Sequence, residues 1–396
     1  MPWPIPALTA FDRPAPIRMS VWLSVFVAVM GGGAGTVLLL WPQGSATNTL
    51  SFWLLLIALP ACAFGLLFGL RLVQWEREQL VAEESERESA RLTSLWRDWA
   101  RRPLPVIRAA AFLPVVPGAG ALAAGGADLP VNVGRSVGFP WAGGNKADTR
   151  CETLLGLIAD RFSDVLVALQ SIEVLLVLDD ASPARETQWK ANAKRLLEAV
   201  APDLAMHITV VHAHSGHCAQ WLEACLDADG MPIKLVIAAQ IWSDTGDSRF
   251  SEGAAALLLG PRAAVGRRHA GREHAPAALI LRPMTSPLGA IAADLRQMLD
   301  VQGRPGALPR AWLSGHDRED RIALLTELCA PVEHKPLVLQ LDDILGAHGP
   351  VNGWIALAAA LEAAAQDPER QLVAWQEPGG DQTHLCVVVP AKPGGS

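Results

Sequence analysis

Two apolar runs, VWLSVFVAVMGGGAGTVLLLW (residues 21–41) and FWLLLIALPACAFGLLFGLRL (residues 52–72), decide how the rest of the chain is organised. Each has about the 20 residues that a helix needs to cross a hydrocarbon core. The connection between them, residues 42–51, is short and carries no charge. The sequence therefore predicts a hairpin of two transmembrane helices, residues 21–72, preceded by a tail, residues 1–20.

Basic residues around the two runs predict their orientation. Arg13 and Arg18 precede the first run, and Arg71 and Arg77 close the second, whereas the connection has none. Because basic residues favour the cytoplasmic side, both chain ends are expected in the cytoplasm. A cleaved signal peptide is the alternative for the first run. It fits less well, because the run is long, no A-x-A-like site ends it and a second apolar run follows.

Small residues in the hairpin are compatible with two kinds of packing. The first run contains four glycines and the second contains Pro60. Small residues allow two helices to approach closely, but glycine is also tolerated where a helix faces lipid. Neither run has a charge at mid-membrane, which argues against a channel or transporter.

Composition excludes several function classes. The formal net charge of −7 gives no basic field for nucleic acid. No cofactor motif is present: the glycines of LPVVPGAGALAAGG, residues 113–126, fit neither phosphate-loop spacing, and a flexible loop is expected there. The six cysteines form no CxxC pair, which is typical of a reducing compartment. They are Cys62, Cys151, Cys218, Cys225, Cys329 and Cys386.

Residues 73–102 predict a charged helix that leaves the membrane. They are rich in Glu, Arg, Gln and Ala, which favour helix, and Glu83 and Arg87 form an i,i+4 pair. Pro103 ends the pattern. The segment is either a solvated spacer or a stalk that binds a partner or a second copy.

Helix-like and strand-like segments alternate from residue 151 onward and predict α/β layers. In the first series the expected helices are 151–169, 187–200 and 219–228, and the expected strands are 173–178, 207–212, 234–240 and 254–259. In the second series the expected helices are 287–299, 318–329 and 351–365, and the expected strands are 277–281, 310–314, 371–375 and 384–389. Both series end on an apolar strand, which indicates a duplicated unit with halves at 103–265 and 266–396.

Three segments resemble the thiolase-like fold of β-ketoacyl synthases. FSEGAAALLL (residues 250–259) is similar to the GEGA motif and its strand, and residues 219–240 are similar to the nucleophile helix and the next strand. LGAH through Gly353, followed by an alanine-rich helix, is similar to the GHxxGAxG motif. The resemblance implies a layered, duplicated α/β fold and allows a homodimer.

The catalytic residues that the resemblance implies match poorly. Such enzymes need a cysteine at a helix N-terminus, where the helix dipole and backbone N–H groups favour thiolate. Counting along the nucleophile helix puts that position near His214 or Ser215, and not securely on Cys218. Ala347 stands where the histidine belongs, with His348 one place later. The expectation is an inactive domain. The alternative is an acyltransferase or condensing enzyme that uses Cys218 with His348 or His217.

Three other clusters of polar or charged side chains are better explained by ordinary structural roles than by a metal or ligand site. His212, His214, His217 and Cys218 are zinc-type ligands, but no second ligand pair follows, so no metal site is assigned. Asp244, Asp247 and Glu252 lack the spacing of a calcium loop. A basic loop is expected to be solvated or, if it faces the membrane, to contact anionic lipid. Its residues are Arg262, Arg267, Arg268, His269 and Arg272.

The order of two spans, a charged helix and a degenerate thiolase-like domain is also similar to accessory proteins of bacterial type VI secretion loci. That resemblance implies an adaptor or scaffold in the bacterial inner membrane. Its partners would be the lipid bilayer and a secretion effector or apparatus protein.

Overall fold

The computed structural model describes most of the chain in thirteen stretches, and these form two units. The stretches are residues 3–4, 13–42, 44, 46–115, 118–125, 129–143, 146–179, 183–213, 217–244, 249–261, 275–303, 308–330 and 335–391. One unit, here called the globular unit, comprises Met1–Pro4 and Arg97–Ser396, and the other, here called the hairpin unit, comprises Ile5–Trp96.

The hairpin unit consists of two apolar helical segments, as predicted. Helix α1 is Met19–Leu40, and the second segment passes from α2 (Leu50–Trp53) through a π-helical turn (Leu54–Ala58) into α3 (Leu59–Ala100) without a break. Both segments are long and apolar enough to cross a membrane, and little of either is buried in the protein. The predicted stalk is therefore the continuation of the second apolar helix, and ion pairs such as Arg87 with Glu83 lie on its surface.

Close packing of the hairpin depends on one glycine. A Cβ atom on Gly33 would lie 2.4 Å from Cγ of Pro60, whereas Gly31, Gly32 and Gly35 have open space around them. Proline also clashes with the carbonyl group four residues earlier, and the π-helical turn just before Pro60 widens the helix where this strain falls. Close helix approach is thus confirmed at Gly33. The other three glycines have no atom close enough to contact an added Cβ atom.

In its described residues the globular unit has a mixed sheet of eleven strands, in the order β3-β2-β4-β5-β1-β6-β11-β10-β8-β9, with β7 paired to β11. The first half contributes β1 (Pro103–Phe112), β2 (Ser171–Leu178), β3 (Ala205–His212), β4 (Lys234–Gln240) and β5 (Gly253–Leu259). The second half contributes β6 (Ala278–Leu281), β7 (Met284–Pro287), β8 (Arg310–Ser314), β9 (Leu337–Gln340), β10 (Gln371–Gln376) and β11 (Gln382–Pro390).

The two halves have the same topology, which confirms the predicted duplication. Leaving out the short β7, each half has five main strands, β1 to β5 in the first half and β6 and β8 to β11 in the second. In each half the second, third and fourth of these run parallel, and the fifth is antiparallel to its neighbours on both sides. The halves join where β1 pairs antiparallel with β6. The spatial order of the main strands is third, second, fourth, fifth and first in both halves.

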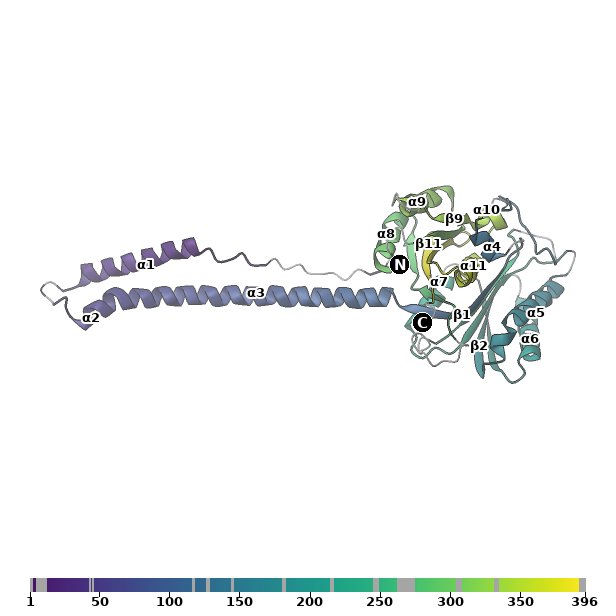
Figure 1. Cartoon of the computed structure of the whole chain (residues 1–396), viewed down its shortest axis with the longest axis horizontal. Coiled ribbons are helices and arrows are strands. Elements are labelled where there is room, and N and C mark those ends of the chain that lie inside the picture. The colour runs from purple at the N-terminus through teal and green to yellow at the C-terminus, as the bar shows by residue number, and fades with distance from the viewer. Residues whose placement is uncertain are drawn as a thin grey trace. The chain divides into compact units, whose positions relative to one another are not determined.

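Helices cover both faces of the folded sheet and fill its centre (Figure 1). Helices α5 (Ala147–Leu166) and α6 (Pro183–Val200) pack on the outer face of the first half, and α8 (Ile291–Gln302) and α9 (Arg318–Cys329) lie beside the second half. Between the halves lie α7 (His217–Asp227) and α11 (Asn352–Gln366), whose apolar side chains share one core with strands of both halves. The result is a layered α/β arrangement with helices on both faces of the sheet.

Some predicted element assignments were wrong. The expected loop at residues 113–126 contains a short helix, α4 (Ala119–Ala123), and the helix expected at 287–299 is α8, preceded by β7. Strands β1 and β9 and the short helix α10 (Leu341–Leu345) were not predicted. The basic loop from Arg262 to Arg272, and Asp247, lie outside the described residues.

Candidate functional site

The three segments that carry the family resemblance meet where the parallel strands have their carboxyl ends, and this end of the sheet is here called its site edge. Strands β4, β8 and β10 end there, and α7 and α11, the two central helices, begin there. Gly346 and Gly315 make the tight turns that bring the loops together, with φ angles of 91° and 81° that favour glycine. A Cβ atom on Gly346 would lie 2.3 Å from the carbonyl oxygen of Arg135, so the chain segments approach closely here.

Gln240, at the end of β4, connects the two halves at this edge. Its Nε2 donates to the carbonyl oxygen of Ser251 at 2.7 Å, and its Oε1 accepts from the N–H of Val351 at 3.3 Å. The N–H of Ser251 donates to the carbonyl oxygen of Ala347 at 2.8 Å. The loop before α11 is therefore fixed against the first half by backbone and amide hydrogen bonds.

Glu252, the acidic residue of the GEGA-like segment, is fully buried and forms an ion pair with the partly buried Arg150. Its carboxylate accepts from Nη1 of Arg150 at 2.9 Å, from the N–H of Phe139 at 2.9 Å and from the N–H of Trp242 at 3.0 Å. The Arg150 guanidinium also stacks over the Trp242 ring, 5.8 Å from its centroid. These bonds tie together three separate segments of the first half, around Phe139, Arg150 and Trp242. Asp244 likewise accepts from the N–H of Ala147 at the start of α5.

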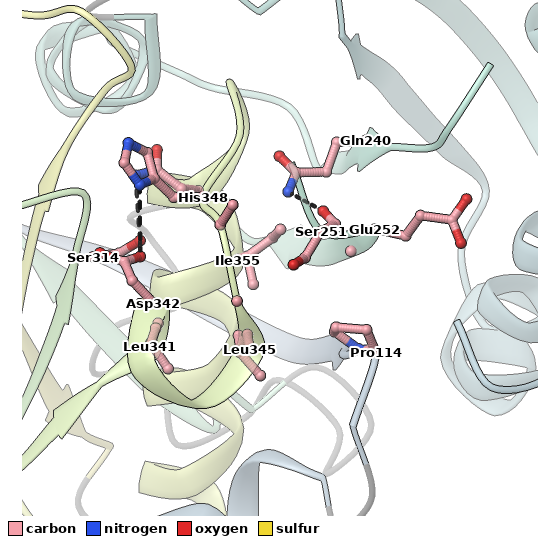
Figure 2. Close-up of a pocket in the computed structure, with 14 residues that line it drawn as sticks. Pro114, Gln240, Ser251, Glu252, Ser314, Leu341, Asp342, Leu345, His348 and Ile355 are labelled. Atoms are coloured by element: carbon pink, nitrogen blue, oxygen red, sulfur yellow. Dashed lines mark hydrogen bonds and ion pairs between the residues drawn. The ribbon is translucent and has the colours of Figure 1, made fainter. Parts of the chain in front are cut away.

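His348 lies beside Asp342 (Figure 2), and Asp342 is already bonded to the turn after β8. The carboxylate accepts from Ser314 Oγ at 3.0 Å and from the N–H of Gly315 at 2.7 Å. Nδ1 of His348 is 3.9 Å from Oδ1 of Asp342. Burial raises the pKa of Asp342, and the neighbouring His348 partly offsets this.

Cys218 occupies the first turn of α7, which begins at His217. His214 and Ser215, the positions that residue counting suggested for the nucleophile, lie outside the described residues. The side chain is 3% exposed and belongs to the apolar core shared by both halves. Burial raises its pKa well above the usual range of a thiol, and Glu377 and Cys386 raise it further.

Sequence reasoning missed His316, which follows β8 at the same edge. His316 is buried, and among the described residues neither ring nitrogen has a hydrogen-bond partner. Burial lowers its pKa to about 4, so the ring is neutral at pH 7. Burial also lowers the pKa of His384 to about 4, and its Nδ1 lies 3.0 Å from Thr285 Oγ1. The sequence signal was a histidine directly after a strand and a turn, Ser314-Gly315-His316.

The remaining predicted ligands are only partly described. Nε2 of His212 is 3.9 Å from a carboxylate oxygen of Glu186, and His214 lies outside the described residues. His217 is the first residue of α7. Within the described stretches, no group of three or more His, Cys, Asp or Glu side chains could hold a metal ion.

A cavity at this edge is about as large as one water molecule. Its volume is about 20 Å³, and its lining includes Gln240, Ser314, Asp342, His348 and Asn352 (Figure 2). Asn352 is committed to the protein, because its Nδ2 donates to Ser314 Oγ and to the carbonyl oxygen of Gln376. Cys218 does not line this cavity. Among the described residues, this cavity has room for about one water molecule.

Comparison with known proteins gives matches of fold only. No family model matches the chain, and no curated protein matches it in sequence. Solved structures that it resembles include a tetronic acid condensing enzyme, with 16% identity and a TM-score of 0.47 over 72% of this chain and 99% of that one. Another is the ishigamide ketosynthase/chain length factor, with 19% identity and a TM-score of 0.48 over 73% of this chain and 99% of that one.

The peroxisomal 3-ketoacyl-CoA thiolase of Saccharomyces cerevisiae is also similar. It has 10% identity and a TM-score of 0.46, over 73% of this chain and 98% of that one. That enzyme is described as a five-layered α-β-α-β-α structure built from two core domains of identical topology. The globular unit has a layered thiolase-like α/β fold, preceded by two apolar helices.

Proposed function

We propose that this chain is a membrane-anchored thiolase-like protein without catalytic activity, which works by binding other proteins. The observation that carries the proposal is the surroundings of Cys218. Its thiol lies in the apolar core beside a carboxylate and a second thiol, and these raise its pKa where a nucleophile needs it lowered. The cavity at the same edge holds about one water.

The alternative, an acyltransferase or condensing enzyme, has less support. It requires Cys218 to react with His348 or His217 as its base. His348 faces Asp342, and the buried His316 and His384 stay neutral at pH 7, so they supply no imidazolium charge to a thiolate. His348 lines the cavity at the site edge, whereas Cys218 does not.

Alkylation of the native protein tests whether Cys218 is inert. With iodoacetamide at pH 7.5, we expect Cys329, which is partly exposed, to react at least about 100-fold faster than Cys218, which should react only after unfolding. Peptide mass spectrometry of the full-length protein in detergent measures both rates in one sample. Modification of Cys218 as fast as Cys329 would contradict the proposal.

The anchoring part of the proposal rests on the two apolar helices and the placement of basic residues around them. We expect a reporter enzyme that is active only outside the cytoplasm to be silent when fused after Ser396. The same reporter should be active when inserted in the connection at residues 43–48. Activity at Ser396, or silence of the inserted reporter, would rule out the proposed orientation.

The partner in this proposal is a secretion effector or apparatus protein, as the resemblance to type VI accessory proteins implies. Two copies of the chain are also expected to pair. A second copy could add a strand at either outer edge of the described sheet, because β3 has only β2 beside it and β9 has only β8.

A further inference from the structure

Trp3 is seated in the globular unit, far in sequence from everything it contacts. Its side chain is only 4% exposed, and its Nε1 donates to the carbonyl oxygen of Pro283 at 3.0 Å. Its ring meets that of Trp99 edge to face, with 6.1 Å between centroids. Buried tryptophan is stable when its N–H is bonded and its ring is stacked, and both conditions hold here.

Trp99 and Pro283, the residues that contact Trp3, are here called its seat. They adjoin Arg282 and Gln302, which bond the last turn of α3 and are here called the joint. The Arg282 guanidinium is 2% exposed, stacks over Trp99 at 4.2 Å from the ring centroid, and donates from Nε to the Trp99 carbonyl oxygen at 3.2 Å. Nε2 of Gln302 donates to the carbonyl oxygen of Ala100 at 2.8 Å. The last carbonyl groups of a helix lack partners within it, and here buried side chains of the second half supply them.

The same arginine connects this joint to α7. Nη1 of Arg282 donates to Oδ2 of Asp227 at 3.1 Å, and Nη2 pairs with Oδ1. Asp227 is the last residue of α7, the helix whose first turn carries Cys218. Arg282 therefore bonds the end of α3 and the end of α7 at once, and Trp3 packs on the Trp99 ring that Arg282 also contacts.

We infer that the seat of Trp3 is a binding site for an extended peptide containing tryptophan, and that its resident ligand is the chain's own N-terminal segment. Occupancy of the seat tightens the joint between α3 and α7. Trp3 is the described residue of this segment that enters the globular unit, and its release frees the seat for a peptide in trans. A tethered ligand has an effective concentration of about 1 mM, and the free peptide must be supplied near that level to compete.

Hydrogen–deuterium exchange of the full-length protein in detergent tests this inference. Trp3→Ala should raise exchange several-fold in residues 97–104 and 223–231 and leave α5 unchanged. The matched control is Pro4→Ala, which alters the exposed neighbour and should behave as wild type. Equal exchange in wild type and Trp3→Ala, or a rise spread evenly over the globular unit, would overturn the inference.

A peptide added in trans makes the test specific. At about 1 mM, MPWPIPALTAFDR (residues 1–13) should restore protection to the Trp3→Ala protein, whereas the same peptide with alanine for tryptophan should not. Equal effects of the two peptides, or no effect of either, would also overturn the inference. Neither result depends on whether Cys218 is reactive.

Discussion

Replacing Glu252 by alanine is expected to lower the free energy of unfolding by about 3 to 5 kcal/mol, which is the usual cost of leaving one partner of a buried ion pair uncompensated. Glu252 has no exposed side-chain surface, and the side chain of Arg150 is 14% exposed. The substitution also leaves the N–H groups of Phe139 and Trp242 without their acceptor. Urea unfolding of the detergent-solubilised protein measures the change.

Two further variants show whether charge or shape is responsible. Glu252→Gln keeps the size and one acceptor oxygen but loses the charge, so it should cost roughly half as much. Glu198→Ala removes an exposed i,i+4 partner of Lys194 and should cost less than about 0.5 kcal/mol. Equal losses for Glu252→Ala and Glu198→Ala would show that the buried pair does not hold the loops together.

Gly353→Ala is expected to destabilise the protein by about 1 to 3 kcal/mol through overpacking. An added Cβ atom would lie 2.4 Å from Nε1 of Trp375, whose ring is fully buried and cannot move aside. The substitution pushes the first turn of α11 away from β10 and so distorts the loop that carries His348.

The control for this prediction is the opposite effect at another helical glycine. Gly156 lies within α5 and has open space around it, so Gly156→Ala should stabilise the protein by roughly 0.5 to 1 kcal/mol. Thermal unfolding of both variants distinguishes the two cases. A neutral Gly353→Ala would mean that α11 does not pack on Trp375 as described.

Apolar runs with clear ends could be predicted from the sequence. The expected strand at residues 234–240 is β4, and the expected helix at 318–329 is α9, with the same bounds. Asp317 explains the sharp start of α9, because its carboxylate caps the helix by accepting from the N–H of Asp320. The two apolar runs of the hairpin are helices for the same reason of length and composition.

Strand β1 could not be predicted, because its own sequence does not favour a strand. PLPVIRAAAF contains two prolines, an arginine and three alanines. The strand exists because β5 and β6 pair with it on its two sides, and these contacts come from residues far away in sequence. Strands β7 and β9 were also missed, and each has only four residues.

The candidate site could be predicted in its loops but not in its contacts. The GEGA-like and GHxxGAxG-like segments do lie together, as the resemblance implied. Residue counting could not show that α7 begins at His217 or that Cys218 is buried beside Cys386, since both depend on how the halves fold together. His316 was missed because one histidine after a strand carries no spacing pattern.

The mass of the full-length protein after incubation with acyl-CoA and acyl-carrier-protein thioesters tests the central claim most directly. An inert thiolase-like body predicts no acyl adduct on Cys218. A stoichiometric adduct that Cys218→Ser abolishes, and that Cys225→Ser on the same helix leaves intact, would show instead that the protein is an enzyme.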